Sequence, residues 1–150
     1  MTLPPKVCLD TDVILDFLLR REAFYRPAAR LFQAGMDGKI RLQASAASLK
    51  DVFYFARKST GTGQVDGERR GREIIRLLLQ VVEVCALDRS LWEEALASPI
   101  KDTEDALQVA CAGRNQADFL VTRNSKDFAA ALYPQVVLPE VLLAILTTGP

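Results

Sequence analysis

Short apolar runs rich in β-branched residues alternate along the chain with longer segments whose apolar positions recur at helical spacing. The first pattern predicts buried strands, and the second predicts amphipathic helices. Residues 135–146 are expected to form a strand and then a helix, with Pro139 where one changes to the other. The other predicted strands cover residues 6–10, 40–45, 81–88 and 118–122. The other predicted helices cover residues 11–21, 26–39, 46–59, 68–80, 90–98, 102–116 and 125–132.

Strands that alternate with helices imply βαβ units, in which helices cover both faces of a central parallel sheet. The sequence therefore predicts an α/β fold. The segment 59–67, STGTGQVDG, is expected to be a long loop because Gly, Thr and Ser dominate it. It is too short to separate two cores, and the sequence contains no internal repeat. One domain covering residues 1–150 is therefore expected.

The composition is that of a globular protein, with 49% apolar and 25% charged residues. The formal net charge is zero, so an RNA partner would have to be met by a local basic patch. The cysteines Cys8, Cys85 and Cys111 lie far apart in apolar segments, without C-x-x-C spacing. They are therefore expected to be reduced core residues and not ligands of zinc.

The sequence contains no histidine. This excludes Ser-His-Asp triads, Cys-His pairs, histidine acid/base catalysis and histidine-bound zinc. An enzyme with this sequence must use carboxylates, a thiol or cations. The opening residues, MTLPPK, lack the basic and apolar regions of a signal peptide, and no apolar run is long enough to span a membrane. A cytoplasmic location without membrane contact is therefore expected.

Several aspartates are expected at one edge of the predicted sheet. In an open parallel sheet, the carboxyl ends of the strands and the N-termini of the returning helices lie at the same edge. Asp10 ends the first predicted strand, and Asp105 lies in the first turn of a helix. Asp127 lies in the first turn of the short helix that follows residues 118–122, and Asp51 lies one to two turns into its helix.

Each acid, taken singly, can be explained as a helix cap, a first-turn acid or a solvated helix residue. Together they would repel, since two unit charges about 5 Å apart cost roughly 3 kcal/mol at an effective dielectric near 20. Several such pairs rival a total stability of about 5–15 kcal/mol, so the cluster requires a cation. Oxygen ligands select Mg²⁺ or Mn²⁺, which can orient a phosphodiester and stabilise its developing charge without histidine. Capping or a first-turn position could explain the pairs Asp10 and Asp12, Asp102 and Asp105, and Asn124 and Asp127. Asp51 could be a solvated helix residue.

The residues around these aspartates resemble the PIN domain, the fold of VapC-type toxins from bacterial toxin-antitoxin pairs. The resemblance extends over nearly the whole chain, and it implies a PIN-like αβα sandwich with a central parallel sheet flanked by helices. The most specific feature of the resemblance is that the last two matching segments occur in this order and after the first one. The matching segments are VCLDTDVILDFLLRRE (7–22), SAASLKDVFYFARK (45–58), DTEDALQVACAGRNQADFLVTRN (102–124) and TRNSKDF (122–128).

The resemblance implies a Mg²⁺- or Mn²⁺-dependent endoribonuclease that forms a homodimer and is neutralised by a cognate antitoxin. It assigns catalytic roles to Asp10, Asp51, Asp105 and Asp127, and makes Asp10, Asp105 and Asp127 the metal ligands. Asp51 stands where the family usually carries glutamate, which is a departure. The expected supporting residues are Thr11, Asp12, Asp102, Thr122 and Asn124, with Asp12 at a position where asparagine is common. The cations nominated for RNA contact are Arg20, Arg21, Arg57, Lys58, Arg123 and Lys126.

Two other readings stay open from the sequence. The segment VCLDTDVI also resembles the D-x-D motif of haloacid-dehalogenase-type phosphatases, with Asp10 as nucleophile and Asp12 as acid. The later segments EDALQVACA and TRNSKDF fit the PIN pattern better. The third reading is a PIN domain that only binds a partner, which the Asp51 departure allows.

Overall fold

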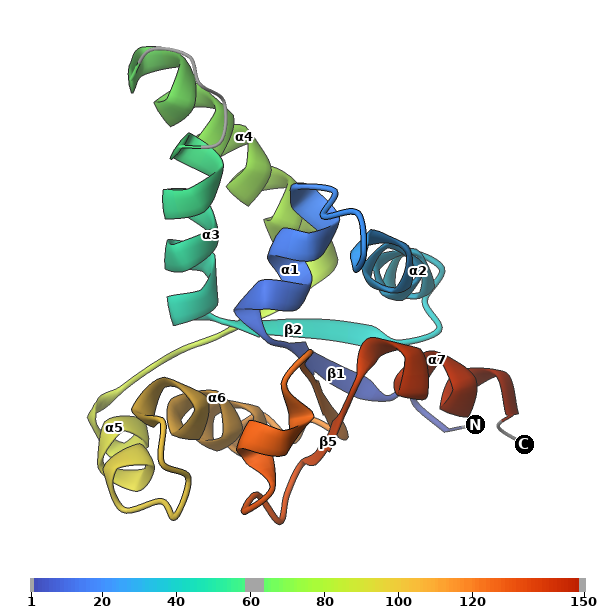
Figure 1. The fold of residues 1–150 in the computed structure, drawn as a ribbon, viewed down its shortest axis with the longest axis vertical. Coiled ribbons are helices and arrows are strands. Elements are labelled where there is room, and N and C mark those ends of the chain that lie inside the picture. Colours follow the sequence, from blue (N-terminus) through green and yellow to red (C-terminus); the bar gives the residue numbers. More distant parts are fainter. Residues whose placement is uncertain (1, 59–63, 149–150) are drawn as a thin grey trace.

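The computed structural model describes residues 2–58 and 64–148 (Figure 1). Their strands form one five-stranded sheet in the order β3-β2-β1-β4-β5, and every neighbouring pair is parallel. The central strand β1 places Val7 beside Leu42 of β2 and Phe119 of β4. The strands are β1 (Lys6–Leu9), β2 (Arg41–Ser45), β3 (Val82–Cys85), β4 (Phe119–Val121) and β5 (Gln135–Val137).

Successive residues of a strand face opposite sides of the sheet, and β1 shows the consequence. Val7 and Leu9 enter the larger core, which α1, α2, α3, α4 and α7 complete. Cys8 enters a core on the opposite face, with Leu120 and Phe128. Because both faces are covered, a continuous apolar run is what a strand of this sheet requires. The helices are α1 (Thr11–Leu18), α2 (Tyr25–Met36), α3 (Ala46–Lys58), α4 (Gln64–Val81), α5 (Arg89–Leu96), α6 (Thr103–Arg114) and α7 (Pro139–Thr148).

Figure 1 shows α1, α2, α3 and α4 on one side of β1 and β2, and α5 and α6 on the other. The helices α3 and α4 pack along each other and project beyond the sheet. Glycines on α4 permit this close packing: a Cβ atom on Gly71 would lie 2.8 Å from the Phe53 ring, and one on Gly67 would clash with the carbonyl oxygen of Arg57. A larger residue at Gly67 would force the two helices apart, and one at Gly71 would displace the Phe53 ring.

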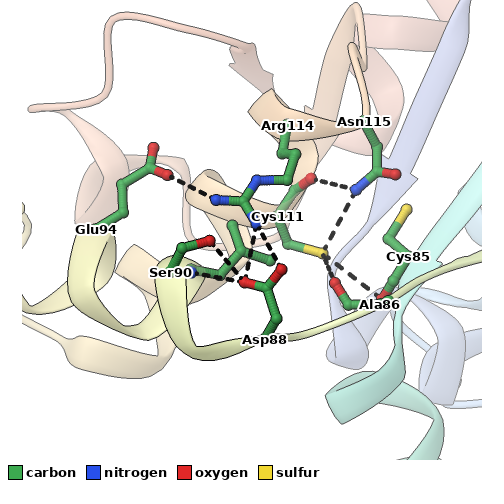
Figure 2. Close-up of polar contacts among 9 residues, drawn as sticks. Cys85, Ala86, Asp88, Ser90, Glu94, Cys111, Arg114 and Asn115 are labelled. Atoms are coloured by element: carbon green, nitrogen blue, oxygen red, sulfur yellow. Dashed lines mark hydrogen bonds and ion pairs between the residues drawn. The ribbon is translucent and has the colours of Figure 1, made fainter.

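A polar network fixes α5 against α6 on the second face (Figure 2). Asp88 is the N-cap of α5, and its Oδ1 accepts a hydrogen bond from the Leu91 amide at 3.0 Å. Nη1 of Arg114, at the end of α6, donates to both Asp88 carboxylate oxygens at 2.9 and 3.0 Å. The Cys111 thiol lies 3.8 Å from the carbonyl oxygen of Cys85, where β3 ends. The network therefore joins β3, α5 and α6.

The structure confirms the predicted α/β fold and the free, buried state of Cys8, Cys85 and Cys111. All predicted strands are present within a few residues of their expected bounds. Ser45 caps α3, since its Oγ accepts from the Ser48 amide at 3.1 Å. None of the helices formed by residues 2–58 and 64–148 combines the length and apolar character that a membrane-spanning segment needs.

Several expected boundaries were wrong; the helix expected over 26–39, for example, ends at Met36. The expected loop 59–67 is helical from Gln64 onward, and residues 59–63 lie outside the described part of the chain. The expected helix 125–132 is only a single 3-10 turn, η1 (Ser125–Phe128). The first helix ends at Leu18 instead of residue 21, and Arg20 beyond it has a left-handed backbone with φ 49°.

Candidate active site

Asp10 lies at the carboxyl end of the central strand, where it is both the first residue after β1 and the N-cap of α1. Its amide donates to the carbonyl oxygen of Val121, so Asp10 and Thr122 end neighbouring strands at the same level. Oδ2 of Asp10 accepts from the Thr122 hydroxyl at 2.8 Å, and Oδ1 accepts from the Thr11 amide at 2.8 Å. Burial raises the pKa of Asp10, and the hydrogen bonds from Thr122 and Thr11 oppose that rise.

A chain of amide and hydroxyl groups supports this carboxylate from the side of α3 and α6. Nε2 of Gln108 lies 2.8 Å from Ser48 Oγ and 3.3 Å from Asp10 Oδ1. Ser48 Oγ is also 2.8 Å from the Thr11 hydroxyl and 3.2 Å from Ser45 Oγ. Four elements thus fix the direction in which Asp10 points, because α1, β2, α3 and α6 each contribute a side chain to the network.

Asp105 reaches the same edge from the first turn of α6. The N-cap of that helix is Asp102, whose Oδ1 accepts from the Asp105 amide at 2.9 Å. Partial burial raises the pKa of Asp105 to about 6, and the negative charges of Asp102, Asp10 and Asp127 add to the rise. The contributions of Asp10 and Asp127 mean that carboxylates remote in sequence lie close enough to Asp105 to repel it.

One cavity of about 500 Å³ opens between α1, α3, α5 and α6, and both Asp10 and Asp105 line it. Its acidic side chains outnumber its basic ones, so the field inside the cavity favours a cation. The cavity also exposes aromatic rings at its rim. Its charged lining residues are the acids Asp10, Asp12, Asp51, Glu104 and Asp105 and the bases Arg21 and Lys50; its aromatic lining residues are Phe55 and Trp92.

The acidic side chains of the cavity are candidate ligands for the divalent ion that the sequence implies. Within residues 2–58 and 64–148, no three acidic or thiol side chains converge closely enough to enclose an ion by themselves. Mg²⁺ does not need such an enclosure, since proteins commonly hold it by one or two carboxylates together with water and substrate phosphate. Asp10 and Asp105 supply two carboxylates in one electronegative cavity, so the residues fit a hard divalent ion.

The other acids predicted for the site differ in their positions. Asp51 lines the cavity one turn after Ser48, and its carboxylate forms neither a hydrogen bond nor an ion pair with the other described residues. Asp127 adds to the negative field at Asp105 but is not part of the cavity lining. Asp12 lines the cavity and faces Arg21 and Arg123, at 3.5 and 3.8 Å. The expected capping arrangement is present at Asp102, whereas Asn124 makes no side-chain cap.

Arg21 and Arg123 are held by a buried carboxylate that the sequence analysis did not single out. Nε of Arg123 lies 2.8 Å from Asp16 Oδ2, and Nη1 of Arg21 lies 3.4 Å from Asp16 Oδ1. Asp16 is 1% exposed, and burial raises its pKa while the two guanidinium groups oppose the rise. Arg123 also lies over the Phe24 ring, 4.1 Å from its centroid. Arg123 therefore anchors the segment after β4 to α1, and Arg21 ties the end of α1 back to the same carboxylate.

The remaining nominated cations lie away from the cavity. Arg57 pairs with Glu68 at 3.7 Å, and Lys58 contacts the hydroxyl and ring of Tyr54. Arg20 lies over the Tyr25 ring at 5.8 Å, and Lys126 is exposed on η1. Of the six residues nominated for RNA contact, only Arg21 belongs to the lining that the described residues form.

The sequence analysis also missed Gln108, Ser48, Lys50 and Trp92, all of which line the cavity. Helical spacing could have identified the first two. Gln108 lies three residues after Asp105, and Ser48 lies three residues before Asp51, so each shares a helix face with an acid of the site. The sequence carried no such signal for Trp92, because its position depends on how α5 packs against α6.

Together these features define an α/β protein with an all-parallel sheet and a carboxylate-lined cavity at the carboxyl ends of its strands. The family model for the PIN domain matches residues 6–126. The chain therefore belongs to the PIN domain family, as its motifs indicated. PIN domains of this kind are typically nucleases that use a divalent metal ion, which favours that chemistry over the phosphatase reading.

Solved structures show the same fold. A toxin-antitoxin complex from Klebsiella pneumoniae has 25% identity and a TM-score of 0.65, with 89% of this chain and 97% of that chain covered. VapBC2 from Rickettsia felis, bound to a promoter DNA fragment, has 15% identity and a TM-score of 0.62, covering 89% and 98%. VapBC-1 from nontypeable Haemophilus influenzae has 18% identity and a TM-score of 0.62, covering 90% and 98%. Comparison with curated protein sequences gave no match.

Proposed function

We propose that the protein is an endoribonuclease dependent on Mg²⁺ or Mn²⁺, and the toxin of a type II toxin-antitoxin pair. The observation that carries the proposal is the meeting of Asp10 and Asp105 in one cavity at the carboxyl edge of the sheet. These residues are remote in sequence, and partial burial together with the like charges around Asp105 raises its pKa to about 6. A divalent cation offsets that repulsion.

The proposed roles follow from the contacts of each side chain. Asp10 and Asp105 hold the ion, which when bound supplies Lewis-acid stabilisation of the charge that develops on a phosphodiester. Thr122, Thr11 and Gln108 fix the two Asp10 oxygens, so the carboxylate needs no reorganisation when substrate arrives. Asp51 extends the acidic wall along α3, and Asp127 strengthens the negative field from outside the cavity.

RNA is the proposed substrate, and the proposed protein partners are a second copy of the chain and an antitoxin. The antitoxin is supported by the complexes with which the fold is shared, including VapBC2 of Rickettsia felis and VapBC-1 of Haemophilus influenzae. Lys50 and Arg21, which line the cavity, are proposed to contact the RNA backbone first. Such a toxin is expected to act in the cytoplasm, where its RNA is.

A cleavage assay tests the proposed activity. The purified protein is incubated with a fluorogenic single-stranded RNA in buffer with Mn²⁺ or Mg²⁺ and, in parallel, with EDTA. Cleavage is expected with either ion and is expected to stop in EDTA, because the carboxylates of the site carry no proton-transfer partner such as histidine. Absence of cleavage under all these conditions would support a PIN domain that only binds a partner.

A further inference from the structure

We propose that Trp92 and Phe55 form a nucleobase-binding subsite of the carboxylate cavity, in which their rings stack on unpaired bases of the substrate. The inference rests on the proposed nuclease function and adds the residues that bind bases. Trp92 comes from α5 and Phe55 from α3, yet both line the cavity that contains Asp10 and Asp105. Their residues are 47% and 45% exposed, so each presents substantial ring surface to a ligand.

The position of Phe55 follows from helix geometry. Ser48, Asp51 and Phe55 all line the cavity, and their spacing of three and four residues puts them on one face of α3. At about 1.5 Å per residue, Phe55 lies roughly 10 Å along the helix from Ser48, which belongs to the network around Asp10. The α3 wall therefore runs from the hydroxyl groups at the carboxylate centre, past an acid, to an exposed ring at the rim.

The network in Figure 2 holds α5, the helix that carries Trp92, against α6. Arg114 of α6 binds Asp88, and Asp88 caps the start of α5. Leu91 and Ala95 of α5 are buried in the core that this helix shares with α6. Trp92 directly follows Leu91, so it lies beside the buried face of α5. Apolar packing and ion pairs both anchor this helix.

The chemistry of the cavity matches a nucleotide chain. Aromatic side chains stack on bases of any sequence because every base has a π-face, and cations track the phosphates. The cavity provides Phe55 and Trp92 for the first task and Lys50 for the second, next to the carboxylates that hold the proposed metal ion. Bases inside a duplex do not offer their faces, so stacking on these rings requires unpaired nucleotides.

The first test uses Trp92 itself as the reporter, because it is the only tryptophan in the chain. An Asp10→Asn protein, chosen to prevent cleavage, is titrated with a short mixed-sequence single-stranded RNA. Tryptophan fluorescence is expected to be quenched as bases stack on the indole. An otherwise identical abasic strand is expected to bind without this quenching, and so is the same RNA annealed to its complement.

The second test measures cleavage by variants of the wild-type protein. Trp92→Ala and Phe55→Ala are each expected to raise KM by about fivefold to a hundredfold, the range that corresponds to loss of one stacked base. Trp92→Phe keeps an aromatic ring and is expected to recover most of the loss. Leu96→Ala is the matched control, because Leu96 is 71% exposed on the same helix and does not line the cavity. Thermal melts establish that each variant is folded.

The outcomes separate this inference from the proposed function. Wild-type cleavage with unchanged KM in folded Trp92→Ala and Phe55→Ala overturns the subsite and leaves the nuclease standing. Base-dependent quenching without any wild-type cleavage supports the subsite and contradicts the nuclease. Equal quenching by the abasic strand overturns base stacking, and so does a fluorescence change caused by protein concentration alone, which would mean that a second copy covers the ring.

Discussion

The Asp10→Asn protein is expected to cleave RNA at least about a hundredfold more slowly than the wild type while remaining folded. A hundredfold corresponds to about 2.7 kcal/mol of activation free energy, a reasonable cost for removing a charged group at a metal-dependent centre. The amide keeps the shape of the carboxylate and can still accept from the Thr11 amide, so helix α1 keeps its cap. The measurement is the initial cleavage rate in Mn²⁺, with a thermal melt of each protein.

Asp118→Asn is the matched control for this prediction. Asp118 precedes β4 at the opposite edge of the sheet, where its Oδ2 accepts from the Lys6 amide at 2.8 Å. The same chemical change there removes one negative charge far from the cavity, and the cleavage rate is expected to stay within about twofold of the wild type. A folded Asp10→Asn protein that cleaves as fast as Asp118→Asn would exclude Asp10 from the catalytic centre.

Arg123→Ala is expected to lower the free energy of unfolding by about 3 kcal/mol, a large share of the roughly 5–15 kcal/mol that stabilises a typical domain. The substitution removes the guanidinium 2.8 Å from the buried Asp16 carboxylate and leaves only Arg21, at 3.4 Å. A buried charge that loses a partner is costly because water does not replace the lost interaction. The contact with the Phe24 ring is lost as well. Urea denaturation measures the difference.

Two further variants show whether the buried charge is the cause. Asp16→Asn combined with Arg123→Ala is expected to recover part of the lost stability, because a neutral amide is less costly to bury than an unpaired carboxylate. Lys126→Ala changes an exposed cation three residues along the same segment and is expected to alter stability by less than about 0.5 kcal/mol. If Arg123→Ala lowers the free energy of unfolding equally in the wild type and in the Asp16→Asn protein, the ion pair does not stabilise the fold.

Much of the fold could be predicted from the sequence because strand and helix patterns differ in period. The errors have physical causes. Gly67 was taken as a loop residue, yet it lies in α4, where its missing side chain lets α3 approach. The helix predicted over 125–132 lacks an apolar face, since Phe128 is buried but Ala129, Ala130 and Leu132 are exposed. Helical composition alone did not stabilise that segment as a helix.

The positions of Asp10 and Asp105 could be predicted because they follow from topology: strand ends and helix starts meet at one edge of a parallel sheet. The contacts between elements could not be predicted in this way. The bridge from Gln108 to Asp10 joins residues 98 positions apart. In the sequence, Asp16 is one polar residue of a largely apolar segment that was not singled out, and only the tertiary structure shows that Arg123 lies against it. Such pairings depend on the packing of whole elements.

The most direct test of the shared carboxylate site is the melting temperature of the protein with and without millimolar Mn²⁺, for the wild type and Asp105→Asn. Without metal, Asp105→Asn is expected to melt about 2–4 °C higher, because it removes a partly buried and repelled charge whose cost is about 1 kcal/mol after allowance for solvent screening. Mn²⁺ is expected to raise the melting temperature of the wild type and to have little effect on Asp105→Asn. An unchanged wild-type melting temperature in Mn²⁺, or an equal rise in both proteins, would contradict a cation site built on Asp10 and Asp105.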